Sequence, residues 1–171
     1  MSSADEWSRA FARQAKADLA ARETLQDNSR LPRCEELHCL QMAVEKLAKA
    51  YQLAAGTIGP NEVRRSHAYA EKALPGLYRE AMRARGARGV RRWEMEAVRR
   101  LARQMDLLHP AVDDGGARPD NTEYPWEDGS GAVQTPAEWK FDGLSALYGR
   151  SIGTKLMKVL QVCADDLADG T

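Results

Sequence analysis

Cysteine is scarce in this chain, which has three among its 171 residues. They stand at positions 34, 39 and 163, an odd count without a CxxC pair, so a framework of structural disulfides is not expected. Unpaired thiols are typical of a reducing cytoplasm. The first ten residues are polar and include Asp5 and Glu6, whereas a secretory signal has a basic start and an apolar stretch. We therefore expect a cytoplasmic protein.

Long apolar runs and an excess of charge of one sign are also missing. No stretch of about 18 consecutive apolar residues occurs, so no membrane span is predicted. The 25 basic and 25 acidic side chains cancel, which excludes a protein that coats nucleic acid through bulk electrostatics. The sequence has no P-loop, no GxGxxG and no calcium-loop spacing. We predict neither a metal site nor a cofactor.

The zero net charge hides two opposed regions. Nine arginines gather between positions 79 and 103, whereas residues 113–128 are rich in Asp and Glu. One interpretation is a basic face that binds RNA or an acidic partner. The other is an acidic loop that folds back on the Arg-rich helices. The sequence leaves both open.

β-Branched residues are sparse and nowhere alternate with polar ones, so we predict no strand. Ala, Leu, Arg, Glu, Lys, Gln and Met dominate and favour helix. Apolar residues at spacings of three and four predict a first helix at about 5–27, a second at 33–55 and a fourth at about 90–108. A third should start near Ser66 and bend or split at Pro75 and Gly76.

The last helix should run from Thr135 or Pro136 to about Leu167, with Thr135 and Glu138 in a capping box. Before it, residues 110–135 form a long acidic loop rich in Gly and Pro, and loops of this length are usually functional or disordered. Tyr124 and Trp126 favour a packed loop. The fold class is therefore all-α, an up-down bundle of four or five helices in one domain spanning residues 1–171.

Residues 40–51, LQMAVEKLAKAY, carry a recognisable pattern of Gln41, Ala43, Glu45, Lys46 and Lys49. A histidine, His67, opens the next helical region, and the segment NTEYP at 121–125 precedes the last one. In this order, the three features resemble the core helix, the following His and the Arg-Tyr-Pro segment of HEPN domains. The resemblance covers roughly residues 8–167.

The resemblance implies a four- or five-helix bundle that often forms a homodimer. HEPN proteins include metal-independent RNases, toxins paired with nucleotidyltransferase antitoxins, components of defence systems, and binding modules without catalysis. In this chain Glu123 stands where the family pattern has Arg. A negative charge therefore replaces a group that would suit an anion.

HEPN nucleases are similar to one another in an Arg followed, after four to six residues, by a His. Arg103 and His109 match this pattern, as do Arg33 and His38. A His can move the proton of an attacking RNA 2′-hydroxyl, and an Arg can stabilise charge on the phosphate. Arg103 and His109 differ by about 240° around a continuous helix and would not share a face. The alternative role for His109 is a C-terminal helix cap.

Two further groups are candidate binding residues. Arg64, Arg65 and His67 form a small basic cluster that suits a phosphate or is a solvated turn, and Tyr124 and Trp126 offer aromatic rings in the long loop. Glu45 and Lys49 lie four residues apart on one helical face, which predicts an ion pair on the helix surface.

Two functions follow from these observations. The first is a HEPN-like binding or oligomerisation module of a defence or toxin–antitoxin system, whose partner is a second copy, a nucleotidyltransferase or RNA. The second is a metal-independent RNase that uses Arg103 and His109. An unrelated helical bundle with an interaction role is a third interpretation.

Overall fold

The computed structural model describes residues 3–63, 70–110, 121–145, 147 and 151–170, and its elements are mainly α-helical, as predicted. The helices are α1 (Ala4–Gln26), α2 (Arg33–Ala54), α3 (Ala70–Ala84), α4 (Arg92–Asp106) and α6 (Ser151–Asp169). The first, second and fourth predicted helices agree with α1, α2 and α4 within one to two residues at each end. Among the described residues, no helix has the length and apolar character needed to cross a bilayer.

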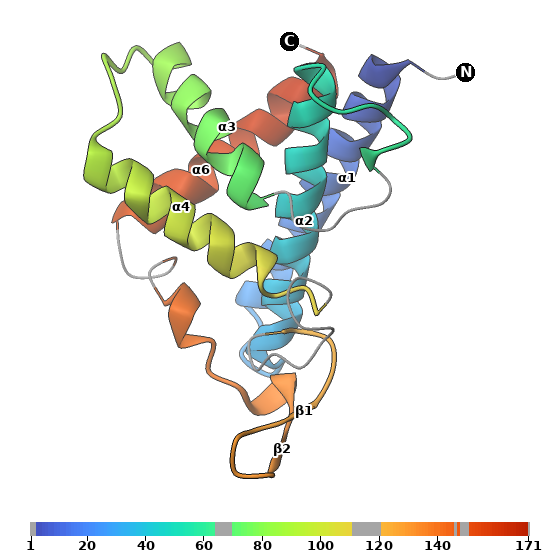
Figure 1. Ribbon diagram of the computed structural model, residues 1–171, viewed down its shortest axis with the longest axis vertical. Helices are drawn as coiled ribbons and strands as arrows, with labels where there is room; N and C mark the ends of the chain where they lie inside the picture. Colours follow the sequence, from blue (N-terminus) through green and yellow to red (C-terminus); the bar gives the residue numbers. More distant parts are fainter. Residues whose placement is uncertain (1–2, 64–69, 111–120, 146, 148–150, 171) are drawn as a thin grey trace.

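Helices α1 and α2 lie side by side and run in opposite directions, with α6 packed against α1 (Figure 1). Ser3 caps α1 through a capping box with Glu6, which satisfies two backbone N–H groups that the helix leaves open. Fully buried residues from α2, including Leu37, Leu40 and Leu47, face one core together with residues of every other helix. The core therefore forms around α2.

A buried polar group joins the other three helices. Glu94 of α4 accepts hydrogen bonds from the Tyr78 hydroxyl of α3 at 2.6 Å and from Lys155 Nζ of α6 at 3.2 Å. These donors hold the pKa of Glu94 below its ordinary value, with the Tyr78 bond as the largest cause. Because only 6% of Glu94 is exposed, its carboxylate fixes how the three helices meet.

A bend or a split was predicted at Pro75 and Gly76. Helix α3 is continuous through both residues, so the split is wrong. Pro75 lies in the second turn and removes only one backbone donor. Ala73, Leu74, Leu77 and Tyr78 are buried around it, and their packing outweighs that loss. The predicted start near Ser66 lies outside the described residues.

The last helix begins later than predicted. Residues 136–144 form two short 3-10 helices, η3 (Pro136–Glu138) and η4 (Asp142–Leu144), and Thr135 makes no capping bond. Between them Trp139 is extended, and Phe141 is left-handed at φ 51°. Phe141 is only 2% exposed, so burial of its ring, worth about 1.5–3 kcal/mol, outweighs a capping box worth about 1 kcal/mol.

The long loop contains a hairpin that the sequence did not predict. Strands β1 (Trp126–Glu127) and β2 (Val133–Gln134) pair antiparallel. Asp128 shapes the turn, because its carboxylate accepts bonds from the backbone N–H groups of Ser130 and Ala132 and from the Ser130 hydroxyl. The Ser130 hydroxyl is the largest cause that lowers the pKa of Asp128 to about 2. Two-residue strands are too short for the alternation by which strands are recognised.

Candidate functional site

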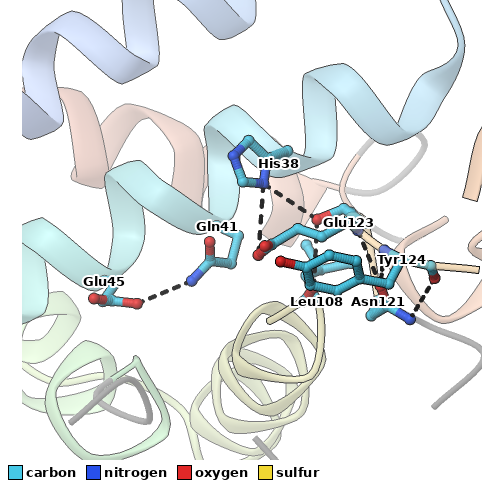
Figure 2. Close-up of polar contacts among 8 residues, drawn as sticks. His38, Gln41, Glu45, Leu108, Asn121, Glu123 and Tyr124 are labelled. Atoms are coloured by element: carbon cyan, nitrogen blue, oxygen red, sulfur yellow. Dashed lines mark hydrogen bonds and ion pairs between the residues drawn. The ribbon is translucent and has the colours of Figure 1, made fainter. Parts of the chain in front are cut away.

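The segment with the NTEYP sequence folds into a tight turn, residues 121–124, which we call the Asn121 turn (Figure 2). Asn121 is fully buried, and its Oδ1 accepts bonds from the backbone N–H groups of Glu123 at 2.9 Å and Tyr124 at 2.8 Å. Its Nδ2 donates to the Tyr124 carbonyl at 3.1 Å. An Asn side chain that closes the backbone in this way fixes the turn, so Glu123 and Tyr124 are held in place.

The Asn121 turn is fastened to both α4 and α2. The Thr122 backbone N–H donates to the Leu108 carbonyl just after α4, at 3.0 Å. On the other side His38 of α2 lies 3.4 Å from the Thr122 hydroxyl and 4.0 Å from Glu123 Oε1, measured from its Nδ1 (Figure 2). The structure therefore brings together two sequence features that are more than 80 residues apart in the chain.

His38 is the first residue of a polar row along α2 that continues with Gln41, Glu45 and Lys49 at spacings of three and four. Gln41 Nε2 donates to Glu45 Oε2 at 3.1 Å, and Lys49 Nζ donates to Glu45 Oε1 at 2.6 Å. The last three residues are at most 8% exposed, so the predicted ion pair forms, but it is buried and not on the surface. Helix α1 covers it, with the Phe11 ring centroid 5.8 Å from Lys49 Nζ.

Arg103 and His109 are not brought into one cavity. Arg103 lines a cavity of about 500 Å³ beside α4, where its Nη1 lies 3.5 Å from Glu71 Oε2. His109 follows the end of α4, its backbone N–H donates to the Asp106 carbonyl, and it does not line that cavity. In the second pair, Arg33 donates to the Lys140 carbonyl while His38 faces the Asn121 turn.

The two aromatic candidates of the long loop differ in exposure. Tyr124 is 58% exposed at the Asn121 turn, whereas Trp126 is 5% exposed and packs edge-on against Trp139 with ring centroids 5.3 Å apart. Tyr124 is therefore accessible to a partner and Trp126 holds the hairpin. Arg64, Arg65 and His67 lie outside the described residues. Residues 111–120 of the acidic loop lie outside the described residues. In the Arg-rich segment, Arg92 pairs with Glu96 and Arg103 with Glu71.

Sequence reasoning missed two residues with defined roles. One is His38, whose spacing of three from Gln41 places it in the α2 polar row as well as in an Arg–His pair. The other is Asp106, between Arg103 and His109 in the sequence. It is 3% exposed and caps α3 from a distance, since its two oxygens accept the backbone N–H groups of Ala70 at 3.0 Å and Glu71 at 2.8 Å. Nothing in the local sequence signals a cap supplied from 35 residues away.

No family model, curated protein or solved structure matches this chain. The likeness to HEPN domains therefore rests on the residues of α2, on His67, which lies outside the described residues, and on the Asn121 turn.

We expect Asp106→Asn to lower the free energy of unfolding by about 1–2 kcal/mol at pH 7. The amide oxygen can accept a hydrogen bond from one backbone N–H, but the amide NH2 group would face the other N–H, and both are donors. Burial, the largest cause, raises the pKa of Asp106 to about 6. An acid whose pKa is raised in the folded state stabilises the fold when protonated, and this stability is lost as the pH rises through 6.

The native chain should therefore gain stability relative to Asp106→Asn as the pH falls from 7 to 4, by at most roughly 3 kcal/mol, since one pKa unit is about 1.4 kcal/mol. Urea unfolding of both proteins across this pH range measures the difference. A difference that does not vary with pH would contradict this account of Asp106.

Proposed function

We propose that this chain is a HEPN-like domain, built as an up-down bundle, that acts as a binding or oligomerisation module in the cytoplasm, within a defence or toxin–antitoxin system. The observation that carries the proposal is the contact between the α2 polar row and the Asn121 turn. These are two of the three features on which the resemblance rests, and they meet at His38, Thr122 and Glu123.

The surface that suits a partner lies at the end of the molecule where the hairpin is found, which we call the hairpin end. Tyr124 is 58% exposed, Val133 76% and Leu31 41%. Figure 1 shows the α1–α2 connection and the hairpin at the same end, and the bond from Arg33 to the Lys140 carbonyl ties the start of α2 to the segment that follows the hairpin. Exposed Tyr and apolar side chains on a fixed scaffold are typical anchors of protein interfaces.

The geometry favours binding over catalysis by Arg103 and His109. Arg103 lines a cavity that His109 does not, and Asp106 between them caps α3. A general base must reach the proton that it removes, and the cavity that Arg103 lines does not include His109 in one copy. RNase activity is the alternative function, in which two copies of the chain would form one cleft.

We expect the native chain to form a homodimer at micromolar concentration and Tyr124→Ser with Val133→Ser to weaken it. Loss of an interface anchor costs about 2 kcal/mol or more, which corresponds to at least a 30-fold rise in dissociation constant. Sedimentation velocity over a concentration series measures both proteins. The matched control is Trp93→Ser on α4, which removes an aromatic ring that is 52% exposed and lies outside the hairpin end.

Two results would overturn the proposal. A native chain that stays monomeric and binds no nucleotidyltransferase would reject the oligomerisation module. Cleavage of RNA in the presence of a chelator, lost in both Arg103→Ala and His109→Ala with their helical content intact, would establish the RNase instead.

A further inference from the structure

The cavity beside α4 has a separate chemistry from the hairpin end. Its volume is about 500 Å³, within the range that holds a small organic ligand. Ala97 and Leu101 of α4 and Ile152 of α6 supply apolar wall, and Gly143 of η4 supplies another side. A Cβ atom at Gly143 would collide with the Gln104 side chain, so the glycine lets η4 approach α4 closely.

Three arginines line the same cavity, namely Arg99, Arg100 and Arg103, against one glutamate, Glu71. Glu71 forms an ion pair with Arg103. Within the part of the chain that the structure describes, neither Arg99 nor Arg100 has an ion pair or a hydrogen bond from its side chain. In a chain with zero net charge, two unpaired guanidinium groups beside apolar wall form a local site for an anion.

We propose that this cavity binds a small organic phosphate, with the phosphate held by Arg99 and Arg100 and an apolar body against Ala97, Leu101 and Ile152. The planar guanidinium group matches phosphate geometry through paired N–H donors, and its charge does not depend on pH. The apolar wall distinguishes such a ligand from inorganic phosphate, which leaves that wall uncovered.

The other occupant that this surface could take is a single nucleic-acid strand. Trp93 is 52% exposed and lies one helical turn before Ala97, so its ring is on the same side of α4 as the cavity. A strand would stack a base on Trp93 and place phosphates along the arginines. Trp93 does not line the cavity, however, and a cavity volume of about 500 Å³ suits a small ligand.

Titration calorimetry with phenyl phosphate, inorganic phosphate and phenol tests the proposal on the full chain. We expect the native chain to bind phenyl phosphate at one site and more tightly than either fragment. Arg99→Gln and Arg100→Gln should each weaken binding about tenfold, as expected for the loss of a charge-assisted hydrogen bond. Ala97→Phe fills the cavity without a change of charge and should weaken binding by more than tenfold.

The matched control is Arg92→Gln, because Arg92 is on the same helix, outside the cavity, and its side chain is 93% exposed. The dissociation constant of phenyl phosphate for Arg92→Gln should stay within about twofold of the native value. Equal weakening in Arg92→Gln, or full binding in Ala97→Phe, would show diffuse electrostatics and overturn the proposal, as would no binding of phenyl phosphate. Tighter binding of a ten-nucleotide oligouridylate that is lost in Trp93→Ala would overturn it in favour of a nucleic-acid strand. None of these results depends on the state of the hairpin end.

Discussion

Glu45→Ala should lower the free energy of unfolding by about 3–5 kcal/mol, because it leaves the Lys49 ammonium buried without its carboxylate. The Lys49 side chain is 7% exposed and the Glu45 side chain 9%, with Nζ and Oε1 2.6 Å apart. The substitution also removes the acceptor of the Gln41 amide, whose Oε1 already lacks a partner among the described residues. An ion pair on a helix surface contributes only about 0.5 kcal/mol. A larger decrease in the free energy of unfolding therefore indicates that the pair is buried.

Two variants make this measurement specific. Glu35→Ala removes an exposed carboxylate from the same helix and should change stability by no more than about 0.5 kcal/mol. Glu45→Leu combined with Lys49→Met replaces both charges with apolar groups of similar size and should recover most of the loss, since buried ion pairs often stabilise no more than a packed core. Urea unfolding followed by circular dichroism gives all four values. A loss below about 1 kcal/mol in Glu45→Ala would mean that the pair is solvated.

The α2 pattern that resembles HEPN domains thus has a structural explanation as well as a functional one. Gln41, Glu45 and Lys49 are buried partners of one another, and the row reaches the surface at His38, which is half-buried beside the Asn121 turn. A motif of this kind can preserve a fold in which the activity differs. At this end of the row, Glu123 lies beside His38 and Tyr124 is exposed to solvent.

The helices could be predicted because their signals are local. The apolar spacing of α1, α2 and α4 and the breaks between them are set by residues within a few positions. The burial of Glu45 and Lys49 could not be predicted, because it depends on the packing of α1 against α2. Polar residues at spacings of four usually indicate a solvated face. The role of Asp106 could not be predicted either, because its hydrogen-bond partners belong to α3 and are distant in the sequence.

The start of the last helix shows the competition between local and distant effects. Thr135, Pro136 and Glu138 form a good local signal for a helix start, yet only a single 3-10 turn forms there. Trp139 and Phe141 leave the helical conformation and pack instead, Trp139 against Trp126 and Phe141 in the core. A capping box is recognised from a few neighbouring residues, whereas the partners of Trp139 and Phe141 are distant in the sequence.

Trp126→Ala should lower the free energy of unfolding by about 3–5 kcal/mol, the usual cost of removing a large buried aromatic ring. Trp126 is 5% exposed and supports the hairpin through its edge-on contact with Trp139. Because β1 and β2 have only two residues each, their backbone pairing cannot hold the hairpin without this contact. The hairpin should therefore detach, and binding through Val133 should be lost at temperatures where the helices remain folded.

The matched variant is Trp126→Phe. The Trp126 indole N–H is buried and has no hydrogen-bond partner among the described residues, which costs about 1–3 kcal/mol. Phenylalanine removes this donor and keeps most of the ring, so the two effects should offset and leave stability within about 1 kcal/mol of native, with self-association retained. Urea unfolding and sedimentation velocity on both variants separate the contributions. If Trp126→Phe lowered the free energy of unfolding as much as Trp126→Ala, the indole N–H would have to be hydrogen-bonded. The hairpin would then depend on that bond rather than on the ring.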